Sequence, residues 1–364
     1  MYKKMIQHQI FFDFLRFSIG SESEIPGSLI EADWKELYRI AQKQALVGIL
    51  FDGIQRLPSS DVGISRDLLL QWIAQCQMLE KANMRLNDAA IQVSEWFRKK
   101  GFRACILKGQ GNVLLYPNGL HRTPGDIDIW VEGGDKRVIS FVRSISPHEK
   151  ACYHHIEFPS YKGVEVEVHY RPSFLQCFWH NRKLQKYYER VKEEQFSHRM
   201  MLGKQGEIAI PTVEFNLIFQ LTHIYAHLMN EGIGLRQLLD YYYVLISDEL
   251  LLIRDRVQKE LKHLGLWKFA GGIMYIMQEV FDMPASRLIV PPNEKYGKFV
   301  LNEVLEAGNF GKHDERNRFG RSKLGHNLQR VYRDIRLVRY FPAEALCEPI
   351  FRTWHFFWRM KNKK

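Results

Sequence analysis

The sequence predicts an α+β fold in which a small mixed β-sheet is flanked by helical regions on both sides. Residues 30–100 and the residues after 212 carry apolar side chains at three- and four-residue spacing, a pattern typical of amphipathic helices. Between them, short apolar runs bounded by glycine and proline alternate with helical stretches, which is typical of strands in an α/β or α+β core. We therefore expect an N-terminal helical region at 1–100, a sheet-containing core at 101–211 and a C-terminal helical region at 212–364.

The helical regions carry recognisable end signals. The stretch 65–101 closes on Lys99, Lys100 and Gly101, which indicates a basic last turn followed by a C-cap glycine. Thr212 precedes an apolar pattern and is a candidate N-cap. The end of the chain predicts two further amphipathic helices that are rich in aromatic residues.

The core reads as strand, helix, strand, helix, strand, strand. We expect the strands and helices in the following order: strand 102–109, helix 110–117, strand 126–131, helix 135–145, strand 153–158 and strand 163–170.

The formal net charge of +11 belongs mainly to the end of the chain. Residues 311–364 contain 14 Lys or Arg and 5 Asp or Glu. Such a surface attracts polyphosphates, nucleic acid or an acidic partner, and a solvated helical face explains it equally well. No apolar run approaches the roughly 20 residues of a membrane span, and the N-terminus lacks the features of a leader, so we expect a cytoplasmic protein.

The five cysteines are scattered and never form a C-x-x-C pair, so they indicate neither a zinc site nor a disulfide framework. Cys105 lies in an apolar run and is expected to be buried.

Two aspartates, Asp126 and Asp128, stand one residue apart on an expected strand and therefore point the same way. A D-x-D pair alone is weak evidence. A haloacid-dehalogenase-type phosphatase and a glycosyltransferase both fit poorly, because Pro124-Gly125 precedes the pair and the pair begins its strand.

A third carboxylate is expected on the strand 163–170, where valines alternate with Glu165, Glu167 and His169. If the valines face the core, the Glu/Glu/His face lies beside Asp126 and Asp128. Any half-exposed strand alternates in this way. Together with the aspartate pair, however, the pattern favours an oxygen-ligand site for two Mg²⁺ ions of the kind used in phosphoryl and nucleotidyl transfer.

A phosphate-binding turn is expected at Lys108, Gly109 and Gln110, where a buried strand ends and a helix begins. Lys108 and Arg122 would add positive charge. A glycine pair after a strand is weak evidence for phosphate binding when taken alone. It gains support from the order of the other motifs along the chain.

This order resembles the DNA polymerase β-type nucleotidyltransferase superfamily, and more closely the bacterial "uncharacterised nucleotidyltransferase" family. The matching residues are Leu107-Lys108-Gly109, Tyr116-Pro117, Arg122 with Asp126-Ile127-Asp128, Val166-Glu167-Val168-His169, the pair His223 and His227, and the pair Arg236 and Asp240. The resemblance covers roughly residues 30–310, and its middle third is the most specific.

The resemblance implies a Mg²⁺-dependent enzyme that transfers a nucleoside monophosphate from a nucleoside triphosphate to an acceptor hydroxyl, with release of pyrophosphate. It implies that Asp126 and Asp128 bind two Mg²⁺ ions, with Mn²⁺ as a substitute, and that Glu167 binds the ion that activates the acceptor. ATP is the expected nucleotide. The usual Gly-Ser or Gly-Gly of the superfamily is Gly109-Gln110 here, so a serine hydroxyl that could contact phosphate is missing.

Four further polar residues on the C-terminal helices are open to more than one interpretation. His223 and His227 share a helix face with Gln220 and Asn230, and fit nucleotide or acceptor contacts, a hydrogen-bonded pair, or a metal site. Arg236 and Asp240 read most simply as an i,i+4 ion pair, and the resemblance adds a role near the site. His169 is a further candidate contact.

The aromatic runs 240–245 and 351–360 favour core or interface packing over base stacking. Two alternatives to the transferase stay open: a catalytically silent nucleotide- or partner-binding module, and an RNA nucleotidyltransferase that uses the basic C-terminal segment. Nucleic acid is not the favoured partner, and the acceptor is not specified by the sequence.

Overall fold

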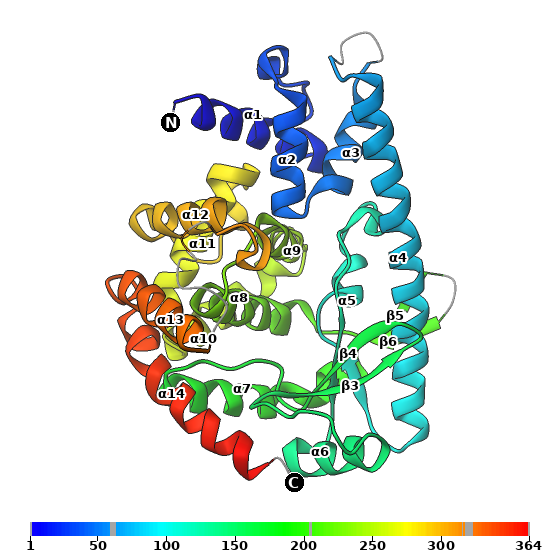
Figure 1. Ribbon diagram of the computed structural model, residues 1–364, viewed down its shortest axis with the longest axis vertical. Helices are drawn as coiled ribbons and strands as arrows, with labels where there is room; N and C mark the ends of the chain where they lie inside the picture. The colour runs from blue at the N-terminus through cyan, green and yellow to red at the C-terminus, as the bar shows by residue number, and fades with distance from the viewer. Residues whose placement is uncertain (1, 59–62, 204–205, 315, 317–322, 363–364) are drawn as a thin grey trace.

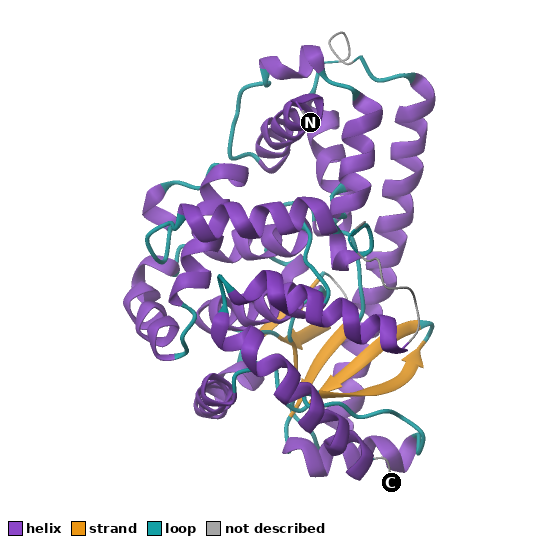
Figure 2. Ribbon diagram, turned by 60° about the vertical axis from the view of Figure 1, so that its left-hand side comes forward, coloured by secondary structure: helices purple, strands orange, loops and turns teal. Residues whose placement is uncertain are grey.

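The computed structural model describes residues 2–58, 63–203, 206–314, 316 and 323–362. It confirms the α+β class, with a small mixed sheet surrounded by helices (Figure 2). The sheet has the order β1-β2-β4-β3, in which β2 and β4 are parallel and the other two pairings are antiparallel. Its strands are β1 (Ala104–Ile106), β2 (Ile127–Val131), β3 (His155–Tyr161) and β4 (Val164–His169).

The register of β2 against β4 sets the geometry of the polar residues. Asp128 lies directly opposite Glu167, and Ile127 lies opposite Val166. Val164, Val166 and Val168 are buried, as the alternating pattern predicts, because side chains on a strand point to opposite faces in turn.

One face of the sheet is apolar and is covered by α4 (Arg66–Lys99) and α6 (Gly134–Ile145). Ile127, Ile129 and Val131 of β2 belong to the same hydrophobic cluster as residues of these two helices. The long α4 runs along the sheet and beyond it toward the N-terminal helices (Figure 1). The alternate residues of β2, Asp128 and Trp130, therefore face the other way.

The opposite face of β2 meets α7 (Phe178–Ser197) and α8 (Val213–Asn230). Trp130 stacks on Phe215 of α8 with ring centroids 5.8 Å apart, and contacts Phe196 of α7 at 4.7 Å. Thr212 is the N-cap of α8 as expected, since its side chain accepts a hydrogen bond from Phe215 N. Helix α8 thus starts beside the sheet and passes along the Asp128 side.

The helices from both ends of the chain share one hydrophobic core. Buried residues of α1, α2 and α3 belong to the same cluster as those of α8, α9 and α11, and α1 contacts α11. Whether residue 100 marks a domain boundary stays a prediction. The remaining helices are α1 (Tyr2–Ile19), α2 (Trp34–Gln44), α3 (Val47–Arg56), the short α5 (Gln110–Val113), α9 (Leu235–Leu245), α10 (Leu250–His263), α11 (Trp267–Phe281), α12 (Glu294–Ala307), α13 (Lys323–Val338) and α14 (Pro342–Lys361).

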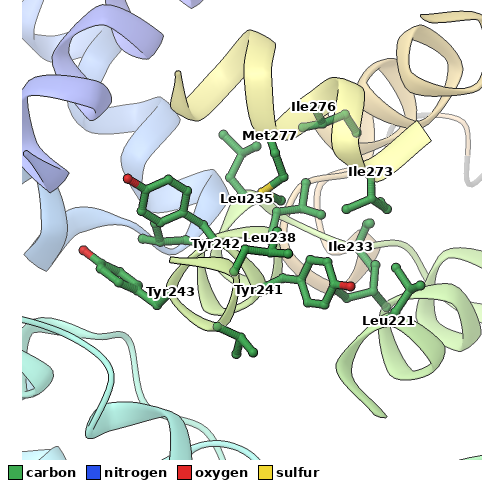
Figure 3. Packing of buried hydrophobic residues seen from close by; sticks show 14 of the residues in the cluster. Leu221, Ile233, Leu235, Leu238, Tyr241, Tyr242, Tyr243, Ile273, Ile276 and Met277 are labelled. Carbon is green, nitrogen blue, oxygen red and sulfur yellow. The ribbon is translucent and has the colours of Figure 1, made fainter. Parts of the chain in front are cut away.

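The aromatic runs 240–245 and 351–360 differ in how far they are buried. Tyr241, Tyr242 and Tyr243 are buried in the shared core, where Figure 3 shows them near Leu238 and Met277. On α14, by contrast, Phe356 and Phe357 are exposed, so they do not pack in the core of this chain. Cys105 is fully buried, as expected.

Two segments differ from the sequence expectation. Helix α7 and the hairpin of β5 (Arg199–Leu202) and β6 (Gly206–Ala209) lie in a part of the core to which the sequence assigns no element. The described helices include none that is both long and apolar enough to cross a bilayer.

Candidate active site

Three carboxylates converge where β2 and β4 run side by side. One oxygen from each of Asp126, Asp128 and Glu167 lies within 4.8 Å of the others. Asp126 immediately precedes β2, and Asp128 and Glu167 are direct neighbours across the parallel pair. The structure therefore brings together the three side chains that the sequence nominated as metal ligands. Glu165 lies on the same strand but is exposed and outside this group.

Three acidic groups this close would repel each other, and two cationic side chains offset that repulsion. Lys108 Nζ lies 3.1 Å from Asp128 Oδ2. His169 Nε2 lies 2.9 Å from Asp128 Oδ1 and 3.4 Å from Glu167 Oε2. Asp128 is completely buried, so its charge depends on these partners.

The titration behaviour follows from this arrangement. Burial opposes charge on Asp128, but Lys108 and His169 outweigh it and lower the pKa of the carboxyl group. Burial likewise opposes charge on His169, yet hydrogen bonds to Asp128 and Glu167 raise its pKa to about 9. For Lys108, burial is outweighed by Asp128, Asp126 and Glu167, which raise the pKa of the amine. The site thus holds carboxylates balanced by an ammonium and an imidazolium.

The donor set fits a hard divalent cation. All three candidate ligands are carboxylates, which Mg²⁺ prefers to nitrogen or sulfur. Asp128 Oδ2 is buried, and its contact with Lys108 is an ion pair and not an aligned hydrogen bond. A buried oxygen without a hydrogen bond from the described residues is suited to a metal ion.

The turn after β1 places Lys108 and Gly109 at the same edge. Gly109 has φ +59° and ψ −107°, and a Cβ there would lie 3.3 Å from Asp126 O, so the turn favours glycine. Gln110 is buried, and its side chain donates to Asn87 Oδ1 on α4 at 2.6 Å. The Gln110 side chain therefore anchors the turn to α4, whereas Lys108 reaches the carboxylates.

Arg122 and Asp240 form a buried ion pair that the sequence did not predict. Arg122 Nε and Nη2 each donate to one oxygen of Asp240 at 2.7 Å, and Tyr116 Oη donates to the same carboxylate at 2.6 Å. The expectation that Asp240 pairs with Arg236 is wrong, because Arg122 and Tyr116 are the hydrogen-bond partners of the Asp240 carboxylate. Arg236 instead donates to Thr123 O at 2.9 Å.

Arg236 differs from Arg122 in having no bidentate carboxylate partner among the described residues. Burial, together with the nearby Arg122 cation, lowers the pKa of Arg236 to about 10. Its guanidinium also lies 5.4 Å from the centre of the Phe310 ring. A buried cation held mainly by a carbonyl and an aromatic ring has capacity for an anionic ligand.

The polar face of α8 continues this network away from the sheet. His223 Nε2 lies 3.0 Å from Lys108 Nζ, and His227 Nε2 lies 2.9 Å from His223 Nε2. His227 Nδ1 in turn lies 3.5 Å from Glu231 Oε2. Among the described residues, no group of three metal-binding side chains includes either histidine. The geometry is that of a hydrogen-bonded pair, and a role in ligand contact stays a prediction.

A cavity connects these elements. It lies between Asp126 and Asp128, the turn after β1 and helices α8 and α9, with Phe310 at one side. Asn112, Gln237 and Phe310 were not predicted as site residues from the sequence. Asn112 follows Gly111 in α5 and Phe310 lies between two glycines, but their uncharged side chains belong to no recognised catalytic motif. The lining residues are Lys108, Gly109, Asn112, Arg122, Gly125, Asp126, Asp128, Phe219, Gln220, His223, Ile224, Arg236, Gln237, Asp240 and Phe310.

Comparison with known proteins adds to this geometry. The model of a family described as "Uncharacterised nucleotidyltransferase" matches residues 31–282. Among solved structures, the chain is similar to an antigenic nucleotidyltransferase-like protein from Paracoccidioides brasiliensis, with 14% identity, a TM-score of 0.33, and coverage of 58% of this chain and 95% of that chain. No curated protein matches the sequence significantly. The family match includes the three carboxylates and the α8 histidines, and it ends before α12.

Proposed function

This chain belongs to the uncharacterised nucleotidyltransferase family, and from that premise we propose that it transfers a nucleoside monophosphate from a nucleoside triphosphate, ATP first, to an acceptor hydroxyl. Pyrophosphate is the other product. The observation that carries the proposal is the convergence of Asp126, Asp128 and Glu167 within 4.8 Å.

Asp126, Asp128 and Glu167 would hold Mg²⁺, which when bound supplies positive charge that polarises the reacting phosphate and lowers the pKa of an attacking hydroxyl. The chain's own contribution is positioning and electrostatics. Lys108 and Arg236 line the cavity as cations, which supports a role for both in contacting phosphate oxygens. Arg122 is held by Asp240, and its main contribution is to fix the loop that leads into Asp126.

His169 has a positioning role in this proposal. It contacts both Asp128 and Glu167, so it keeps the two carboxylates oriented toward one point before a cation arrives. Of the hydrogen-bonded histidines of α8, His223 contacts Lys108 and His227 contacts His223. They are candidates for nucleotide or acceptor contacts.

The experiment measures pyrophosphate release and label transfer with Mg²⁺, each nucleoside triphosphate labelled at the α-phosphate, and a panel of hydroxyl-bearing acceptors. Asp128→Asn and Glu167→Gln should each lower turnover by at least ~10²-fold, because each removes a charged group from the reacting centre. Glu165→Gln is the matched control on the same strand and should keep wild-type turnover.

Wild-type turnover in Asp128→Asn or Glu167→Gln would reject the three-carboxylate assignment. Binding of Mg²⁺–nucleotide without pyrophosphate release, across the acceptor panel, would instead support a silent binding module.

The basic C-terminal segment is engaged within the protein only in part. Arg316 and Arg336 contact Glu303, and Arg333 is buried. These three arginines are therefore less available to the phosphates of an RNA acceptor, whereas Arg339, Arg359 and Lys361 are exposed.

A further inference from the structure

A second cluster of metal-binding side chains lies next to the carboxylates, at the start of β3. Cys152, His154 and His155 each offer a ligand atom within 4.8 Å of the other two. His155 also forms a group with Glu167 and His169 under the same criterion. The two groups share His155, and neither contains Asp126 or Asp128.

The backbone holds this cluster in place. Cys152 N donates to His155 O at 2.9 Å, and Ala151 bridges Ile156, so the segment folds back on itself before β3 begins. His155 lies directly opposite His169 on β4. The rings of His154, His155 and His169 are 4.5 to 5.4 Å apart between centroids.

The cluster has too few protons for its contacts. His155 Nδ1 lies 3.1 Å from His154 Nε2 and 3.3 Å from Glu167 Oε2. Nδ1 carries at most one hydrogen, so it cannot make a full hydrogen bond to both neighbours. One of these two contacts is therefore not a full hydrogen bond, and a cation bound to His155 would replace it.

The ligand chemistry selects the class of cation. Thiolate and imidazole groups favour Zn²⁺ and similar transition-metal ions, whereas Mg²⁺ takes oxygen ligands. Tetrahedral Zn²⁺ keeps sulfur and nitrogen ligands roughly 3.3–3.6 Å apart. The Cys152 Sγ to His154 Nδ1 distance is 3.5 Å, which lies in this range.

We propose that Cys152, His154 and His155 form a three-residue binding site for a transition-metal ion of the Zn²⁺ class, with the fourth position open to water. A surface hollow lined in part by Cys152, His155, Phe356 and Arg359 gives access to the site.

The other described group that contains a cysteine is a weaker candidate. It consists of Cys177, His180 and Glu344. Glu344 Oε2 already accepts hydrogen bonds from Gln176 N and Cys177 N at 2.6 and 3.1 Å, so this carboxylate stabilises the backbone before α7. Cys177 therefore provides a control.

The test is a titration of the full-length, chelator-treated protein with Co²⁺ in excess Mg²⁺, followed by absorption spectroscopy. Mg²⁺ occupies the oxygen ligands, and Co²⁺ reports tetrahedral geometry by visible bands and a thiolate ligand by a near-ultraviolet charge-transfer band. One equivalent of Co²⁺ should produce both features, and Zn²⁺ should displace it.

Variants then assign the ligands. Cys152→Ser should remove the charge-transfer band, and His155→Ala should weaken Co²⁺ binding by at least ~10-fold. Cys177→Ser and Asp126→Asn should leave both spectral features unchanged. Circular dichroism checks that each variant is folded.

Three outcomes would overturn the proposal: no charge-transfer band in the wild type, a band that persists in Cys152→Ser, or a band that disappears in Cys177→Ser. None of these readouts depends on transferase activity.

Discussion

At the residue scale, the positive charge of Lys108 has two possible partners, the Asp128 carboxylate and the phosphates of a nucleotide. The Lys108 amine neutralises Asp128 and also lines the cavity, where in the proposed reaction it would contact a triphosphate. A Mg²⁺ ion bound by the carboxylates would replace part of that neutralisation. We therefore expect Lys108 to have opposite effects on the binding of the metal and of the nucleotide.

Lys108→Met should tighten the binding of Mg²⁺ alone, because a competing cation is removed, and weaken Mg²⁺–nucleotide binding by roughly 10–100-fold, the value of one charge-assisted hydrogen bond. Isothermal titration calorimetry measures both. Lys183→Met, which removes an exposed lysine on α7, should change neither constant. Equal weakening of both constants would show that Lys108 acts only through the fold.

The Arg122–Asp240 pair makes a prediction about stability. Asp240→Asn should lower the free energy of unfolding by about 3–5 kcal/mol at pH 7, because it leaves the buried Arg122 without its counter-charge. Burial opposes charge on Asp240, but Arg122 outweighs it and lowers the pKa of the carboxyl group. Its contribution is therefore present above the unfolded-state pKa, near ~4, and is lost as pH falls below it.

Urea unfolding of wild type and Asp240→Asn from pH 7 down to about 3 tests this, and the difference between the two proteins should narrow below pH ~4. Glu214→Gln removes an ion pair with Arg256 at the surface and should have a much smaller effect. A difference that stays constant with pH would contradict the ion-pair explanation.

The individual site residues differ in how far the sequence specifies them. Asp126, Asp128 and Glu167 follow from strand alternation plus one assumption about which face is buried. The pairing of Arg122 with Asp240 joins residues 118 positions apart, and the sequence around each of them does not indicate the other as its partner. His154 and His155 lie at a strand start, where the sequence gives no sign that Glu167 will be adjacent.

At the element scale, the end of α4 makes a prediction about backbone conformation. Gly101 has φ +79°, and a Cβ there would meet no atom within 4 Å. Gly101→Ala should therefore cost about 1 kcal/mol of stability from backbone strain alone. Gly27→Ala is the matched control. A Cβ at Gly27 would also meet no atom within 4 Å, but the φ of Gly27 lies outside the left-handed region. Chemical denaturation compares the two, and equal effects would refute the strain argument.

The elements that the sequence missed have weak or short patterns. Helix α7 buries Asn181 and Gln195 beside Leu184 and Tyr188, so its inward face is not uniformly apolar. Gln195 is buried because its side-chain oxygen accepts from Thr212 N, a contact made only in the fold. Strands β5 and β6 have four residues each, too few for an alternation to be recognised.

At the scale of the whole molecule, the sheet depends on helices outside the segment 101–211. Phe97 and Val93 of α4 cover one face, and Phe215 of α8 stacks on Trp130 at the other. A fragment of residues 101–211 should therefore fail to fold. Near-ultraviolet circular dichroism and urea titration, with the full chain as control, measure this, and cooperative unfolding of the fragment would show that the segment is an independent domain.

The core shared by both ends of the chain has a consequence for synthesis. Helices α1 to α3 emerge from the ribosome before α11, which contacts α1 and shares a hydrophobic cluster with all three (Figure 1). At ~5–20 residues per second, translation from the end of α3 to the start of α11 takes roughly 10 to 40 s. Throughout that interval the apolar side chains of the nascent N-terminal helices lack their final partner, which makes this stage the one at which a chaperone would be most needed.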